Sequence, residues 1–162
     1  MKTIMKTVLS IPLTAVLLTA ALAGPAAAAK GVPFHGTIQG IEIADLQFPK
    51  IFVDGSGSGN ATHLGCFTLA YELEVDLLAH TTFGSSVFTA ANGDNVFTEH
   101  IGLGTPTENP DVHSLVEVHT ITGGTGRFAG ATGSFIKTSL LNLVTGVTSG
   151  SFDGTIVLDN AN

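Results

Sequence analysis

Two glutamates lie in alternating segments that predict β-strands, and each shares a strand face with apolar side chains. Glu99 is in phase with Phe97 and Ile101. Glu117 is in phase with Leu115 and with two histidines. A carboxylate enclosed in apolar surroundings has a raised pKa and can act as a general acid or base. Both glutamates are therefore candidate catalytic residues, although alternation alone leaves open which face of each strand is the inner one.

Three ring side chains on the same segments are candidates for ligand binding. Tyr71 lies on the apolar face of its segment, Phe97 shares the face of Glu99, and His119 shares the face of Glu117. Small-molecule sites are lined mainly by apolar and aromatic side chains with a few polar groups among them. These three residues would supply such a lining if their faces point into the protein.

His63 is a third catalytic candidate because it lies three residues before Cys66, the single cysteine of the chain. A neighbouring cation favours the reactive thiolate form of a cysteine. Taken alone, Cys66 is expected to be a buried, inert side chain. One cysteine cannot form a disulfide within the chain.

The six histidines of the sequence invite a metal site. A zinc site needs three or four ligands that converge on one point. His113 and His119 would share a strand face, but about 20 Å of extended chain would separate them. No His-x-His or Cys-x-x-Cys pair occurs in the sequence. We therefore predict neither a metal site nor a cofactor.

The first residues have the three parts of a secretory signal peptide. Lys2 and Lys6 give a positive start, residues 8–22 are mostly apolar, and four alanines end the segment at residues 26–29. The apolar run is shorter than the ~20 residues of a spanning helix. We predict that residues 1–29 are removed without leaving a membrane anchor. Residues 30–162 would then form one exported domain, extracellular or periplasmic.

The charge of the chain argues against nucleic-acid binding. Removing Lys2 and Lys6 with the signal would lower the net charge from −7 to −9. Proteins that bind nucleic acids need a basic face that replaces counterions on the phosphates. The four remaining cations are scattered: Lys30, Lys50, Arg127 and Lys137.

Alternation with period two, interrupted by Gly and Asn, predicts an all-β domain. The clearest segment, residues 67–78, places Phe67, Leu69 and Tyr71 on one face and Glu72 on the other. Many short alternating segments with frequent turn signals are typical of a sandwich or barrel. We expect a single antiparallel β-barrel of about eight strands.

Local signals predict three further features of this domain. Asn92-Gly93-Asp94 is a strong hairpin signal. Residues 55–59, Gly-Ser-Gly-Ser-Gly, are expected to form a wide turn or an irregular edge. Two similar short segments, around Phe135 and Phe152, are expected to lie side by side.

Residues 123–133 read Gly-Gly-Thr-Gly-Arg-Phe-Ala-Gly-Ala-Thr-Gly. This segment resembles one found in plant dirigent proteins and in many secreted bacterial proteins, which residues 61–68 and 91–94 also resemble. The resemblance implies the eight-stranded barrel of the allene oxide cyclase and dirigent group, and a trimer. Residues 61–68 depart from the bacterial pattern at Cys66, where arginine is usual. Physically, the glycines of residues 123–133 permit a tight turn, with Phe128 tucked into the barrel end and Arg127 in water or beside a carboxylate.

Three functions remain open at the level of sequence. The first is an exported barrel that binds a small apolar molecule, because barrels of this size can hold one small ligand. The second is a cyclase- or dirigent-like enzyme, or a stereochemical guide, that folds a reactive intermediate in a dry pocket. The third is a barrel filled by its own side chains, with a structural or surface role.

Overall fold

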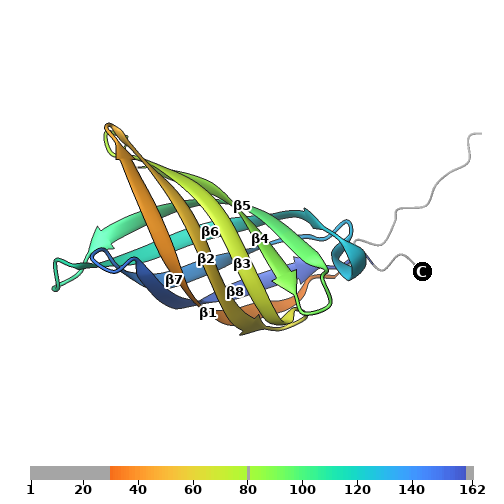
Figure 1. The fold of residues 1–162 in the computed structure, drawn as a ribbon. Helices are drawn as coiled ribbons and strands as arrows, with labels where there is room; N and C mark the ends of the chain where they lie inside the picture. Colours follow the sequence, from red (N-terminus) through yellow and green to blue (C-terminus); the bar gives the residue numbers. More distant parts are fainter. Residues whose placement is uncertain (1–29, 80, 160–162) are drawn as a thin grey trace, which may run out of the picture.

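The computed structural model describes residues 30–79 and 81–159, which form a closed antiparallel barrel (Figure 1). Its eight strands pair in sequence order, and β1 closes the barrel against β8. The strands are β1 (Val32–Gln47), β2 (Lys50–Ala61), β3 (Gly65–Asp76), β4 (Thr81–Ala90), β5 (Asn95–Pro106), β6 (Val112–Gly124), β7 (Thr132–Asn142) and β8 (Val147–Val157). The predicted all-β barrel is confirmed. The predicted signal peptide lies outside the described residues.

The barrel has two ends with different turns. At one end, which we call the hairpin end, lie the turns at residues 48–49, 77–79, 107–111 and 143–146 (left in Figure 1). At the other, the η1 end, lie the turns at residues 62–64 and 91–94 and the short helix η1 (Gly126–Phe128). No helix within the described ranges is long and apolar enough to cross a membrane.

Two predictions about strand boundaries were wrong. Residues 55–59 form no turn: they lie in the middle of β2 and pair with both β1 and β3. The rings of Tyr71 and Phe67 occupy the space in front of Gly55 and Gly59, and the backbone of β1 lies in front of Gly57. Strand β3 ends at Asp76, and Leu77 and Leu78 belong to the following turn, exposed at the hairpin end.

Aromatic side chains fill the half of the barrel next to the η1 end. The rings of Phe135 and Phe152 lie 4.9 Å apart, which confirms that their segments are neighbours. Phe34 contacts both of these rings at 5.2–5.4 Å, and Phe67 and Phe88 complete the layer. This half of the lumen is therefore packed solid.

Glycine lies directly opposite several of the large inward side chains. Gly59 faces Phe67 across the β2–β3 pair, and Gly36 faces Phe152 across the β1–β8 pair. The space that a side chain would take at each glycine is filled by the opposite ring. Small barrels commonly alternate large and small inward residues in this way. The high glycine content is thus part of the packing of the lumen.

Replacing Gly59 by alanine is expected to destabilise the barrel by about 1–3 kcal/mol, as overpacked cores do. The new Cβ would lie 2.6 Å from Cζ of Phe67 and would also meet the carbonyl oxygen of Thr37. Gly31→Ala is the matched control, because its Cβ would have its nearest neighbour at 3.5 Å. Urea unfolding of both variants checks this, and equal stabilities would contradict the packing described here.

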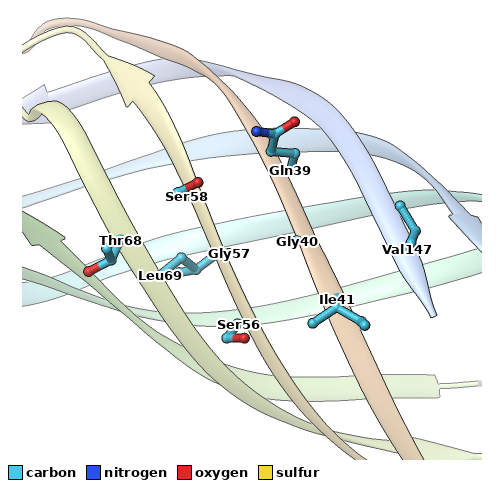
Figure 2. A pocket seen from close by; sticks show the side chains of 9 residues that line it. All are labelled: Gln39, Gly40, Ile41, Ser56, Gly57, Ser58, Thr68, Leu69 and Val147. Carbon is cyan, nitrogen blue, oxygen red and sulfur yellow. The ribbon is translucent and has the colours of Figure 1, made fainter. Parts of the chain in front are cut away.

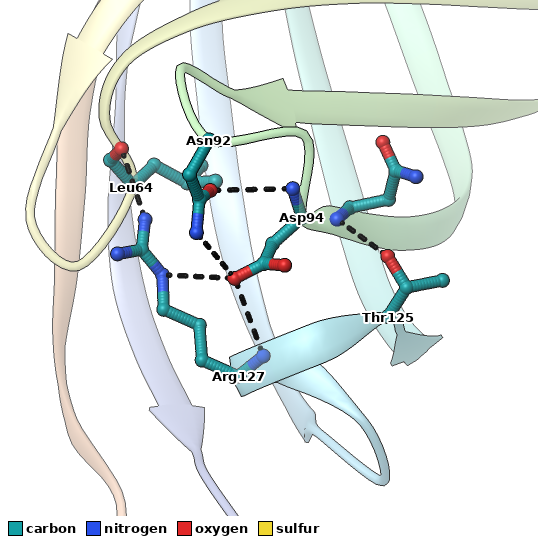
Figure 3. A network of polar contacts seen from close by, with 6 residues as sticks. Leu64, Asn92, Asp94, Thr125 and Arg127 are labelled. Carbon is teal, nitrogen blue, oxygen red and sulfur yellow. Dashed lines mark hydrogen bonds and ion pairs between the residues drawn. The ribbon is translucent and has the colours of Figure 1, made fainter.

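The η1 end is closed by side chains and a polar network (Figure 3). Phe128 is fully buried in the barrel end, as the sequence predicts. The Arg127 guanidinium lies 3.7 Å from the Asp94 carboxylate and donates to the carbonyl oxygen of Leu64 at 3.4 Å. Thr125 accepts a hydrogen bond from the backbone N–H of Asn95. The network ties the turns at Leu64 and Asp94 to the segment around η1.

Candidate functional site

A buried ion pair lies in the half of the lumen nearer the hairpin end. Nζ of Lys137, on β7, lies 2.5 Å from Oε2 of Glu117, on β6. The two residues are register partners, and both side chains are almost completely buried. Two opposite charges that are removed from water together hold each other by a strong attraction, but each is costly to bury alone. The pair therefore fixes a polar centre inside a barrel of otherwise apolar packing.

Two stacked imidazoles lie beside this pair. The rings of His100 and His119 lie 4.5 Å apart, and His119 stacks on Phe135 at the same distance. Burial lowers the pKa of both imidazoles, that of His119 to about 2, where the neighbouring His100 ring and the charge of Lys137 lower it further. Both rings are therefore neutral at physiological pH. Neutral imidazole can donate from one nitrogen and accept at the other.

A tyrosine and a second glutamate complete the polar cluster on β1 and β3. The Tyr71 hydroxyl donates to Oε1 of Glu42 at 2.8 Å, and the Tyr71 ring lies 5.3 Å from Nζ of Lys137. Burial raises the pKa of Glu42, although this hydrogen bond offsets part of the effect. Burial, followed by the Glu42 charge, also raises the pKa of Tyr71. Glu42 is less buried than the others, so it is the carboxyl group of the cluster closest to solvent.

Several buried polar atoms of this cluster have no hydrogen-bond partner among the described residues. Nδ1 of His119 lies 3.0 Å from the Thr98 hydroxyl, and Nδ1 of His100 lies 3.3 Å from the Ser86 hydroxyl. The opposite nitrogen of each ring makes no hydrogen bond, although Nε2 of His100 lies 3.6 Å from Oε1 of Glu117. Native proteins pair nearly all buried polar groups with protein or with water. The unmatched atoms are Nε2 of His100, Nε2 of His119, Oγ of Ser139 and Oγ1 of Thr148.

A ring of apolar side chains separates this cluster from the hairpin end. Its members lie on the inner faces of β2, β3, β6 and β7, and all except Val53 are partly exposed. We call this ring the collar: Ile51, Val53, Leu73, Val75, Leu115 and Leu141. Exposure therefore falls from the collar to the polar cluster beneath it, and we call the two together the cup.

Three of the six residues singled out from sequence lie in this cup. Tyr71, Glu117 and His119 all point into the lumen and are buried there. The structure brings them together with Lys137, His100 and Glu42, none of which the sequence identified. A lysine on a strand is ordinarily expected on the solvent-exposed face, so Lys137 was not considered as a lumenal residue. The signal that could have found it is its phase with Phe135 on the same strand.

The other three candidates lie elsewhere. Glu99 is exposed on the outer face of β5, and Phe97 shares that outer face because its neighbours Val96 and Thr98 point inward. His63 is exposed in the turn before β3, at the η1 end. The enclosed surroundings expected for Glu99 are therefore not present, and neither Phe97 nor His63 reaches the lumen.

Cys66 was also placed wrongly, since it is exposed on the outer face of β3. The inward position is taken by the next residue, Phe67, and the alternation of the strand turns the cysteine outward. Its sulfur lies 3.4 Å from Nδ2 of Asn60. The histidine three residues earlier gives it no described contact.

A hollow on the outer wall, over β1, β2, β3 and β8, is a weaker candidate (Figure 2). Its floor is backbone at Gly40 and Gly57, and short side chains such as Ser56, Ser58 and Thr68 surround it. It is open to solvent and has no charged lining residue. Binding sites are usually concave and enclose most of their ligand. The hollow offers neither the enclosure nor the chemistry of the lumen.

No group of three or more metal-ligating side chains converges within residues 30–79 and 81–159. Comparison of the chain with protein-family models, with curated proteins and with solved structures finds no match.

Proposed function

We propose that the barrel binds a small molecule with an apolar body and a polar end in the cup, and that this molecule enters from the hairpin end. The observation that carries this proposal is the set of unmatched polar atoms beneath the collar. A ligand whose polar end reaches these atoms would pair them, while its body would replace water at the collar. The resemblance to secreted barrels supports an exported location for this binding.

The collar suggests a direct test with a neutral fluorescent probe, N-phenyl-1-naphthylamine. Leu73→Trp would fill the entrance of the cup and is expected to weaken probe binding at least tenfold. Thr120→Trp, on the exposed outer face of β6, is the matched control and is expected to change binding less than twofold. Circular dichroism shows whether both variants fold. Equal affinities of the two folded variants would overturn the proposal.

Native mass spectrometry of residues 30–162, purified from the organism that makes them, addresses the ligand itself. A retained small molecule would name its class. A bare protein that also fails to bind the probe would favour the filled barrel with a structural role.

A second candidate function is catalysis of a cyclase- or isomerase-like reaction, favoured by the pair Glu42 and Tyr71. A half-buried carboxyl group with a raised pKa can act as a general acid or base. Tyr71 holds this group at the edge of the collar. Glu42→Gln would then retain a ligand in the cup but lose turnover, whereas a binding protein would show no turnover to lose.

Self-association is a separate proposal, supported by the outer wall of β4–β7. Phe83, Ile101, Val118 and Ile136 are exposed register partners, one on each of these four strands. An exposed apolar band of this kind often marks a protein–protein interface. The trimer implied by the family resemblance would be seen as a threefold mass in the same native spectra.

A further inference from the structure

The exposed apolar side chains of the barrel are distributed unevenly between its two ends. The five most exposed large hydrophobic residues of the described chain all lie at the hairpin end: Val144 at 75%, Phe48 at 74%, Ile43 at 71%, Leu78 at 68% and Leu46 at 64%. The η1 end has exposed polar or small residues in its turns instead, among them His63, Asn92 and Arg127. A uniform solvated surface would not produce this asymmetry.

Three separate turns carry these side chains. Phe48 lies at the tip of the long β1–β2 hairpin, which projects beyond the barrel (Figure 1). Leu78 lies in the turn after β3, and Val144 lies in the turn between β7 and β8. A protein partner would need a separate apolar pocket for each of these turn tips, because the tips lie at different points of the rim. A fluid apolar phase takes up all of them without matching their positions.

The charged residues at the hairpin end limit which lipid surfaces it can contact. Asp45, Glu108 and Asp111 are exposed there. The described cation of this end, Lys50, is paired with Glu74 at 2.5 Å. An acidic rim is repelled by anionic headgroups, because basic residues are what attract a protein to them. An uncharged or zwitterionic lipid surface is compatible with this rim.

We propose that the hairpin end docks on a zwitterionic lipid surface, with Phe48, Leu78 and Val144 inserted among the headgroups. The choice of lipid as the occupant rests on the proposed ligand binding, because the collar lies inside this rim. A ligand with an apolar body is concentrated in lipid and scarce in water. A docked barrel would take it up directly through the collar.

The test is flotation of residues 30–162 with phosphatidylcholine vesicles. The wild-type chain is expected to float with them, and the triple variant Phe48→Ser, Leu78→Ser, Val144→Ser is expected to partition at least tenfold more weakly. The matched triple variant on the outer wall, Ile41→Ser, Phe52→Ser, Val87→Ser, avoids the band proposed for self-association and is expected to stay within twofold of wild type. Adding phosphatidylglycerol is expected to weaken flotation.

Three outcomes would overturn the docking proposal. In the first, the wild-type chain stays in solution. In the second, the wall variant loses flotation while the rim variant keeps it. In the third, sedimentation shows that the rim variant has a different oligomeric mass, which would mean that the turn tips contact a second copy of the chain. Probe binding in vesicle-free solution is measured in parallel. A rim variant that binds the probe normally but does not float would show that docking and ligand binding are independent. A wild-type chain that floats but does not bind the probe would refute ligand binding and leave the docking proposal intact.

Discussion

Lys137→Met is expected to destabilise the barrel by about 3–5 kcal/mol, the usual cost of leaving one charge of a buried pair without its partner. Glu117 would remain in the lumen, where its near neighbour Nε2 of His100 lies 3.6 Å away and belongs to a neutral ring. Urea unfolding, with an unchanged dependence on denaturant concentration, measures the loss. The same substitution should weaken retention of a ligand with a polar end.

Removing the second charge as well should recover much of this stability. The double variant Lys137→Met, Glu117→Leu is expected to be at least about 2 kcal/mol more stable than Lys137→Met alone, because contacting groups couple by up to about 3 kcal/mol. Lys50→Met is the control for loss of a cation, since Lys50 pairs with Glu74 on the surface and should matter far less. Equal effects of Lys137→Met and Lys50→Met would mean that water screens the lumenal pair.

Acid is expected to destabilise the barrel through its two stacked histidines. The folded protein keeps both imidazoles neutral, so only the unfolded chain takes up protons there as the pH falls below about 6.5. The contribution of the neutral histidines to stability is therefore complete above this pH. As the pH falls, the contribution of His119 declines until the pH approaches 2. At pH 4.5 the loss from His119 should be roughly 2–3 kcal/mol. Glu42 acts in the opposite direction, because its raised pKa lets the folded state bind a proton more tightly.

His119→Phe is expected to remove most of its share of this acid sensitivity, because a phenyl ring can keep the stack with Phe135. Urea unfolding at pH 7.5 and pH 4.5 gives the difference for each variant. His35→Phe is the control, since His35 is exposed and its replacement should leave the difference unchanged. A wild-type barrel as stable at pH 4.5 as at pH 7.5 would show that the lumen admits protons in the folded state.

The sequence was sufficient for the barrel but not for its lumen. On β3, Phe67, Leu69 and Tyr71 alternate with exposed residues, so the inner face follows from hydrophobicity. Near the hairpin end β6 shows the reverse pattern: Glu117 and His119 point inward, whereas Val116 and Val118 are exposed on the outer wall. Alternation defines the two faces of a strand, but only the closed sheet decides which of them is enclosed.

The same limit explains the unidentified members of the site. Lys137 and His100 come from strands β7 and β5, and they meet Glu117 only because β6 lies between them in register. Glu42 reaches the cluster from β1, and no local sequence pattern predicts how the closed barrel brings β1 near the other strands. The Gly-rich segment of β2 was misassigned because its partners in packing lie on another strand.

The glycines opposite the large inward side chains link pairs of positions that are distant in sequence. Gly84 leaves room for His100, and Gly102 leaves room for the side chain of Glu117. Evolution could enlarge a residue at either glycine only together with a reduction at its partner. The shape of the cup would then change by paired substitutions, in which one strand gains a larger side chain and its neighbour gains a smaller one. Relatives with different ligands would therefore differ at both members of a pair.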